Sequence, residues 1–456
     1  MINNTEKLGS ENIKKLIWDL SVPAITGLLV IALYNIVDAV FVGRGVGVNG
    51  LTALTIVFPI HMIIMALSQM FGIGGQSSLS IALGGGKNKR AGYILYVVSI
   101  LSILTGLIFS ILLKYFSNPL LVMFGADSLI LPYASDYIEV SLYGIPFLIF
   151  FIGLNNLAHS EGNARISMNT MIIAALTNAF LDYVFIFQFS FEIKGAAYAS
   201  VISQIICSIY ILTYFIGKKT VVKYSICRIK TFYLLSYKIS SIGLASFFKQ
   251  IGGSIVIILA NRILPVYGTS NSVAIFGILN RLLMFISMPV FGFLQGINPI
   301  IGFNYGAKNF RRVKSAIRNG IYYSTIVVTV CFVGLMIFPE YILGIFTDEK
   351  ELISEGLLPL KIFFSLLPLL GFQIISAGIF QAMGNAKASM FLTMARQVVL
   401  LIPLIILLPL IYGEKGVYIA FPASEIITFL ISSSMLYFLN KSLNCLNNKM
   451  EGNCFL

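Results

Sequence analysis

The sequence predicts an all-α integral membrane protein with twelve transmembrane helices in two six-helix bundles related by a parallel internal repeat. Three observations support this prediction: the composition is too apolar for a soluble domain, long apolar stretches recur between short polar connectors, and the second half repeats the first. Of the 456 residues, 58% are hydrophobic and 11% are charged, and the mean hydropathy is +0.91. A soluble α-protein needs far more polar residues to cover its surface.

Twelve apolar stretches are long enough to cross a bilayer, whose hydrocarbon core of ~30 Å needs roughly 20 helical residues. The longer stretches imply tilt or kinks. The expected spans are 17–42, 53–82, 93–116, 133–157, 166–188, 196–216, 238–264, 272–300, 317–339, 356–380, 389–411 and 416–439. Prolines inside spans predict bends, because proline removes a backbone hydrogen bond; these are Pro23, Pro59, Pro146, Pro289, Pro368 and Pro403.

The net charge of +13 lies mainly in the connectors between spans. This placement indicates a topological role rather than nucleic-acid binding. With the N-terminus inside, and with Arg396 of span 389–411 counted at its nearest connector, 22 basic residues fall on the inner side and 7 on the outer side. Both termini are therefore expected in the cytoplasm of a cell that carries the protein in its plasma membrane. The N-terminal stretch has no small-residue cleavage site, so we expect a retained first span rather than a signal peptide.

Signals of catalysis are weak. The five cysteines are scattered and odd in number, which argues against a disulfide framework or a metal site. The only histidines, His61 and His159, are far apart in the chain. The glycine- and lysine-rich stretch 83–90, LGGGKNKR, lacks the spacing of a phosphate-binding loop. We therefore expect neither an enzyme nor a cofactor, and no metal beyond a possible Na⁺. The chain also has no repeated filter motif of the kind a channel needs.

The internal repeat is the strongest organisational signal. The segment 161–168, EGNARISM, matches 383–390, MGNAKASM, at an offset of 222 residues, and 194–199, KGAAYA, matches 415–420, KGVYIA, at 221. Each half then carries six spans in one orientation, related by an axis along the membrane normal. The predicted domains are an N-terminal bundle (1–216), a cytoplasmic linker (217–237), and a C-terminal bundle with a short tail (238–456). Two bundles facing a cleft suit alternating-access transport better than a scaffold.

Two carboxylates stand inside apolar spans. Asp38 lies in ALYNIVDAVFVG and Asp182 in TNAFLDYVFIFQFSF, both expected in the outer half of the membrane. Asn178 shares a helical face with Asp182, and Ser200 is expected at the same depth near the start of the next span. The second bundle has no acid at the corresponding positions, so the fold itself does not require these two. Because an intramembrane acid is by default functional, the four residues predict a coupling-ion site for H⁺ or Na⁺; a structural pair neutralised by Arg44 is the alternative.

Other polar and soft side chains are candidates for a substrate cleft or a charge cluster. Aromatic faces attract cations and methionine adapts to varied shapes, although such residues more often simply pack. The cleft candidates are Tyr34, Asn35, Asn155, Asn156, Met284 and Met288. Lys249, Arg281 and Glu425 are all expected near mid-membrane. They could form a neutralised structural cluster, or act in gating or substrate handling.

The quoted motifs, together with VPAITGLLVIALYNIVDAVFVGRGVG (22–47) and IFQAMGNAKASM (379–390), resemble the MATE (multidrug and toxic compound extrusion) family over about residues 12–440. The resemblance implies a twelve-helix antiporter that expels organic, often cationic, compounds in exchange for H⁺ or Na⁺. It implies small lipophilic substrates, contact with membrane lipids, no nucleic acid and a monomer. The alternative is a lipid-linked oligosaccharide or lipid flippase of the same superfamily.

The resemblance also assigns roles to residues. In prokaryotic members, a helix-1 aspartate and an Asn-xxx-Asp pair on helix 5 form the cation site, and these match Asp38, Asn178 and Asp182. Ser200 stands where many members carry threonine. Another branch uses acids on helices 7 and 10. Here helix 7 carries Lys249 and helix 10 carries Gln373, so that second site is expected to be absent or replaced.

Overall fold

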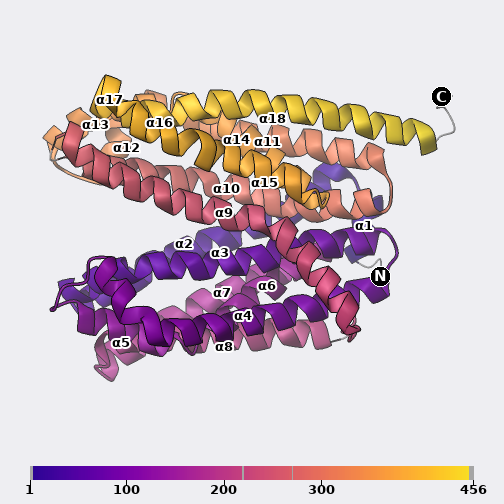
Figure 1. The fold of residues 1–456 in the computed structure, drawn as a ribbon, viewed down its shortest axis with the longest axis horizontal. Coiled ribbons are helices and arrows are strands. Elements are labelled where there is room, and N and C mark those ends of the chain that lie inside the picture. Colours follow the sequence, from indigo (N-terminus) through magenta and orange to yellow (C-terminus); the bar gives the residue numbers. More distant parts are fainter. Residues whose placement is uncertain (1–3, 218–219, 270, 451–456) are drawn as a thin grey trace.

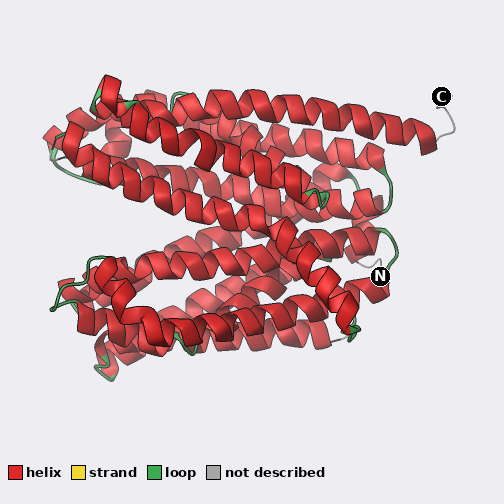
Figure 2. Ribbon diagram, viewed as in Figure 1, coloured by secondary structure: helices red, strands yellow, loops and turns green. Residues whose placement is uncertain are grey.

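The structure is a computed structural model that describes residues 4–217, 220–269 and 271–450. These residues form helices joined by short loops and contain no strand (Figure 2). Ten helices are long and apolar enough to cross a membrane, and two bent pairs bring the number to twelve. The prediction of a twelve-span, all-α membrane protein is therefore confirmed. Lys218 and Lys219 of the predicted linker, and Cys454, lie outside the described residues.

The first half contains six spans and a short N-terminal helix, with a π-helical segment at Tyr183–Gln188. Its α-helices are α1 (Asn4–Ser10), α2 (Ile13–Gly45), α3 (Val48–Gly84), α4 (Asn88–Met123), α5 (Leu131–Ser141), α6 (Ile145–Ser160), α7 (Ala164–Asp182) and α8 (Glu192–Ile216). Most of its buried apolar residues form one cluster of their own.

The second half has the same plan, with a π-helical segment at Ala395–Leu401. Its α-helices are α9 (Ile229–Tyr267), α10 (Ser272–Gly306), α11 (Phe310–Ile337), α12 (Pro339–Gly344), α13 (Lys350–Phe363), α14 (Leu367–Ala382), α15 (Ala386–Met394), α16 (Ile402–Leu407), α17 (Pro409–Tyr412) and α18 (Glu414–Met450).

The two halves lie against each other along their first two spans. Helices α2 and α3 of the first half pack against α10, and α3 also packs along α9. In Figure 1 both chain ends lie at the same end of the molecule, and the halves diverge toward the opposite end. An even number of spans requires both chain ends to lie on the same side. Because the halves diverge away from the termini, the junction between them lies near the end that carries the termini.

Corresponding turns have the same geometry in both halves. Gly162 and Gly384, 222 residues apart, have positive φ angles of 78° and 76°. The amide of Gly162 donates to the His159 carbonyl and that of Gly384 to the Gln381 carbonyl, each at 2.9 Å. The helix breaks also correspond: α5 meets α6 at 57° and α13 meets α14 at 48°.

Two of the predicted proline bends coincide with these breaks. Pro146 and Pro368 each lie in the first turn of the helix that follows the break. A proline is well suited to this position, because its missing N–H is one that the first turn of a helix leaves unpaired anyway. The other four lie within α2, α3 and α10 or in the first turn of α16.

The predicted span limits need correction. Helix α9 begins at Ile229, not at 238, so nine residues of the expected linker are helical. The basic residues Lys230 and Lys238 lower the hydropathy there, but they do not oppose helix formation. The expected spans 4 and 10 are each two helices rather than one. Arg396, whose charge was counted with the nearest cytoplasmic connector, lies in the π-helical segment of its span.

The linker is bound to the first half through Glu161, in the turn between α6 and α7. The Glu161 side chain accepts hydrogen bonds from the Tyr214 hydroxyl at 2.5 Å, the Thr220 hydroxyl at 2.6 Å and the Val222 amide at 3.1 Å. Farther along, the Tyr224 and Ser99 hydroxyls are 2.6 Å apart. The chain between the halves is thus fixed along the surface of the first bundle.

Candidate cation site in the first half

Three helices bring the predicted coupling residues together. Asp38 lies on α2, Asn178 and Asp182 on α7, and Ser200 on α8, and these helices pack against one another. Asp182 is 0% exposed and Asn178 is 1% exposed, while Asp38 is half-buried. Asp182 is also the last residue of α7, directly before the π-helical segment. Such π-helical turns occur frequently at functional sites.

Asn178 bridges Ser200 and Asp182. With its amide nitrogen toward Asp182, it donates to Oδ2 at 2.7 Å, and its oxygen accepts from the Ser200 hydroxyl and backbone amide, each at 3.2 Å. We assign this orientation from the hydrogen-bond network, because an ionised carboxylate has no hydrogen to donate. The reverse orientation would leave the amide oxygen facing the carboxylate. Asn178 therefore holds Asp182 in place.

The two carboxyl groups face each other. Asp38 and Asp182 lie within hydrogen-bonding reach of one another. One oxygen of each, Oδ1 in both cases, is buried without a hydrogen-bond partner among the described residues. Within the same part of the chain, neither acid is ion-paired with a lysine or arginine, and Arg44 is exposed. Two carboxylates in contact need a shared proton or a bound cation.

The surrounding side chains supply further oxygens. The Tyr34 hydroxyl, from α2, and the Tyr137 hydroxyl, from α5, both lie within hydrogen-bonding reach of Ser200. No cluster of three or more His, Cys, Asp or Glu side chains exists in the described residues. A cation here would therefore use the two carboxylates together with amide and hydroxyl oxygens.

Sequence reasoning missed Tyr137. It belongs to no motif, and it reaches the site only because α5 packs against α8 after the bend between α5 and α6. Tyr137 lies one helical turn before Ser141, so the two residues share a face of α5. The sequence does not show which helix that face contacts. Tyr34 was predicted for the substrate cleft, and the structure places it at the cation site.

The remaining cleft candidates do not share one surface. Asn155 and Asn156 are buried within α6, where the Asn156 amide donates to the Ile152 carbonyl at 2.9 Å. On α10, Met284 is 60% exposed and Met288 is buried, while Asn35 on α2 is exposed. None of the six predicted cleft residues lines the cavities of about 790, 690 and 60 Å³ found among the described residues.

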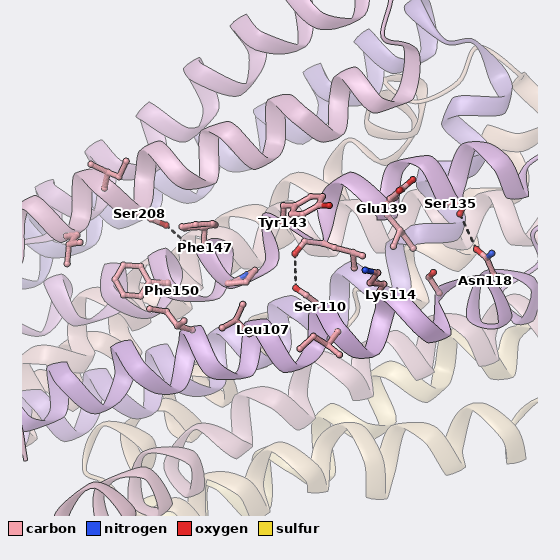
Figure 3. A pocket seen from close by; sticks show the side chains of 18 residues that line it. Leu107, Ser110, Lys114, Asn118, Ser135, Glu139, Tyr143, Phe147, Phe150 and Ser208 are labelled. Carbon is pink, nitrogen blue, oxygen red and sulfur yellow. Dashed lines mark hydrogen bonds between the residues drawn. The ribbon is translucent and has the colours of Figure 1, made fainter. Parts of the chain in front are cut away.

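The largest of these cavities, about 790 Å³, lies between α4, α5, α6 and α8 (Figure 3). Lys114, Asn118 and Glu139 gather at one end, and Phe150 and Ser208 lie toward the other. The Ser110 hydroxyl donates to the Leu142 carbonyl at 2.8 Å, which satisfies a backbone group freed by the helix break. None of the four coupling residues lines this cavity.

The mid-membrane charged residues do not form the predicted cluster of Lys249, Arg281 and Glu425. Glu425 on α18 pairs with Arg396, whose Nη2 lies 2.5 Å from Oε1, rather than with Lys249 or Arg281. Lys249 shares a cavity with Arg396, whereas Arg281 is exposed and outside the residues that line it. The error arose because the charge of Arg396 was counted with a connector, so its pairing with Glu425 was not considered.

Comparison with known proteins places this arrangement in a family. The MatE family model matches residues 23–184 and 241–407, which include Asp38, Asn178 and Asp182. The chain belongs to the MATE family. Its two matched segments correspond to the two halves described above, and the short gap between them contains the linker.

Relatives and solved structures agree over almost the whole chain. "Multidrug export protein MepA" of Staphylococcus haemolyticus (strain JCSC1435) is 25% identical over 432 residues, 95% of each chain. The Staphylococcus saprophyticus protein of the same name is 27% identical over 427 residues, 93% of each. A structure titled "Outward-facing conformation of a multidrug resistance MATE family transporter of the MOP superfamily" matches with a TM-score of 0.88 and 25% identity, covering 96% of this chain and 98% of the other. This MATE-family chain is thus similar to multi-pass export proteins.

Proposed function

We propose that the chain is a secondary active multidrug efflux transporter that exchanges organic, often cationic, compounds for H⁺ or Na⁺ by alternating access. The observation that carries this proposal is the contact between Asp38 and Asp182, with one unpaired buried oxygen on each. A proton or Na⁺ satisfies these oxygens, and its release leaves two adjacent negative charges. The similarity to proteins named as multidrug exporters favours drugs over a lipid-linked oligosaccharide as the cargo.

The proposed arrangement in the cell follows from the charge bias of the connectors. Both termini lie in the cytoplasm, the protein is a plasma-membrane monomer in contact with lipids, and the cation site faces the outer half of the bilayer. In an outward-open state, external H⁺ or Na⁺ reaches Asp38 and Asp182. Because the halves diverge at the end away from the termini (Figure 1), the geometry supports exposure of the site on that side.

Exchange requires that ion binding and drug binding oppose each other. Such coupling is reciprocal and typically amounts to about 1–3 kcal/mol. An ion bound at Asp38 and Asp182 repels a nearby cationic drug, or it favours a helix arrangement that does not hold the drug. The drug then leaves outward as the ion enters, and the ion gradient drives the cycle.

Equilibrium binding of a lipophilic cationic dye to purified protein tests this coupling. Lowering the pH, or adding Na⁺, should weaken dye binding, and the ion that has this effect is the coupling ion. In the Asp38→Asn, Asp182→Asn double variant the dependence should vanish. A dye affinity in the unmodified protein that does not change with pH or with Na⁺ would rule out antiport through this pair.

A further inference from the structure

The second half holds an ammonium group without a counter-ion. Lys249 lies in the middle of α9, and its Nζ is 4.2 Å from the centre of the Phe291 ring. Among the residues that the structure describes, Lys249 forms no ion pair. Placing a charged group inside a membrane span costs free energy, so its presence there indicates a function. The cation–π contact compensates for only part of the lost hydration.

The other cation in this region, Arg396, is already paired. Glu425 Oε1 accepts from Arg396 Nε at 3.1 Å and from Nη2 at 2.5 Å. Lys249 and Arg396 line one cavity of about 60 Å³, and Glu425 is not among the residues that line it. Counted together, Lys249, Arg396 and Glu425 carry a net charge of +1.

The two halves thus carry opposite charge at their centres. The first has Asp38 and Asp182, and the second has the excess cation at Lys249. Lys249 also lies close to the junction between the halves, because the next residue, Gln250, donates to the Met62 sulfur of α3 at 3.0 Å. A substrate that carries both charges can therefore be attracted by both halves.

We propose that Lys249 binds the anionic group of zwitterionic substrates, a carboxylate, while the first half attracts their cationic end. This inference rests on the proposed efflux function. The cavity of about 60 Å³ is the size of roughly two water molecules, so it accepts a carboxylate but not an aromatic body. Gln373, Gln381, Thr393 and Thr428, which also line the cavity, already donate to backbone carbonyls, so the ammonium is the main group that the cavity offers to a carboxylate.

A matched pair of dyes tests the proposal. Rhodamine 110 carries a free carboxylate, and rhodamine 123 is its methyl ester, so the two differ only in the charge that Lys249 is proposed to bind. Efflux of each dye is measured in proteoliposomes under imposed H⁺ and Na⁺ gradients. The quantity compared is the KM for the acid divided by the KM for the ester, since a general loss of folding or turnover cancels in this ratio.

Lys249→Gln should raise the ratio about tenfold, the equivalent of one lost charge-assisted hydrogen bond. Lys249→Arg, which keeps the charge, should preserve most of the preference. Arg281→Gln is the matched control, because it removes one positive charge from the same half at a residue outside the cavity; its ratio should not change.

The outcomes separate this inference from the efflux function. Export of the ester together with an unchanged ratio in Lys249→Gln would overturn the role of Lys249 and leave the efflux function standing. An equal rise in both KM values would show that Lys249 only supports the fold or the gate, and would overturn the proposal as well. Failure of the unmodified protein to export either dye under any gradient would refute the efflux function, and this inference with it.

Discussion

At the scale of single residues, the acids proposed to bind the coupling ion differ from the paired charges elsewhere in the described residues. Burying Asp182 costs a few kcal/mol by insertion scales, and the structure offers it an amide donor but no base within the described residues. Asn178 and Ser200 fix the orientation of its carboxyl group, yet they leave one oxygen of Asp182 without a partner. A site built only for stability would have satisfied both oxygens.

Asp38→Asn and Asp182→Asn should each reduce gradient-driven dye efflux at least about tenfold, because an amide cannot exchange a proton or neutralise Na⁺. Each variant should insert at the normal level, since it removes a buried charge. Transport in membrane vesicles with an imposed pH or Na⁺ gradient measures the effect. Asp136→Asn is the control: this exposed aspartate pairs with Lys194 at 3.2 Å, and such surface pairs contribute little. Normal coupled efflux in both site variants would contradict the assignment.

Glu161 predicts a pH dependence of stability. Burial raises the pKa of this carboxyl above its ordinary value of 4.5, although hydrogen bonds from Thr220, Tyr214 and Val222 oppose the shift. The folded state therefore holds the proton more tightly than the unfolded state does. It follows that this contribution to stability is present below about pH 4.5 and is lost as the pH rises through the raised pKa.

The difference between unmodified protein and Glu161→Gln, measured as the unfolding midpoint across pH 4–8, isolates this contribution. The unmodified protein should lose stability relative to the variant as the pH rises. Glu139→Gln, at an exposed glutamate, should show no such trend. A stability difference that is constant with pH in Glu161→Gln would contradict the predicted sign.

At the scale of helices, the two spans equivalent by the repeat, spans 5 and 11, both contain a π-helical segment. In the first half the segment follows Asp182, and in the second half it contains Arg396. A π-helical turn adds a residue to one turn, and so it rotates every later side chain relative to a regular helix. The two segments do not occupy equivalent positions of the repeat, since 183–188 corresponds to 405–410 at an offset of 222, whereas the second segment is Ala395–Leu401.

The turn glycines give a test of the repeat at this scale. Gly162→Ala and Gly384→Ala should each destabilise the protein by about 1–2 kcal/mol, because the positive φ at these residues brings a Cβ atom too close to the following carbonyl oxygen. Gly334→Ala is the control: it lies within α11, and a Cβ atom there meets nothing within 4 Å. Alanine at 334 should be neutral or slightly stabilising. The thermal unfolding midpoints of the three variants, compared with that of the unmodified protein, test this prediction.

Much of this architecture could be predicted from the sequence, because hydropathy and proline position report on local chemistry. The spans and the breaks before Pro146 and Pro368 are examples. The extension of α9 back to Ile229 could not be found, since a helix that leaves the bilayer becomes polar without ending. The two π-helical segments could not be predicted from the sequence, and Arg396, which pairs with Glu425, lies in one of them.

The cation site shows the same division. Asp38, Asn178, Asp182 and Ser200 could be grouped from their depth and helical spacing alone. Tyr137 could not, because its approach depends on the angle between α5 and α6 and on how α5 packs against α8.

At the scale of the whole molecule, topology can be checked with native cysteines. Cys227 in the linker and exposed Cys445 near the end of α18 are expected on the cytoplasmic side. A membrane-impermeant maleimide should therefore label variants that retain only one of them in inside-out vesicles but not in intact cells. Burial raises the pKa of the Cys227 thiol, so labelling of this residue should quicken as the pH is raised toward 9. Labelling of Cys227 in intact cells would contradict the proposed orientation.

The way the linker is held has a consequence for how the chain is made. Its hydrogen-bond partners in the first half, Ser99 and Glu161, both precede it in the sequence. During synthesis, the segment 220–224 can therefore dock on the finished first bundle before any span of the second bundle has left the ribosome. Domains generally fold as units in the order in which they are synthesised. The docked linker would give the nascent second half a fixed starting point beside α3, the helix that α9 must later pack along.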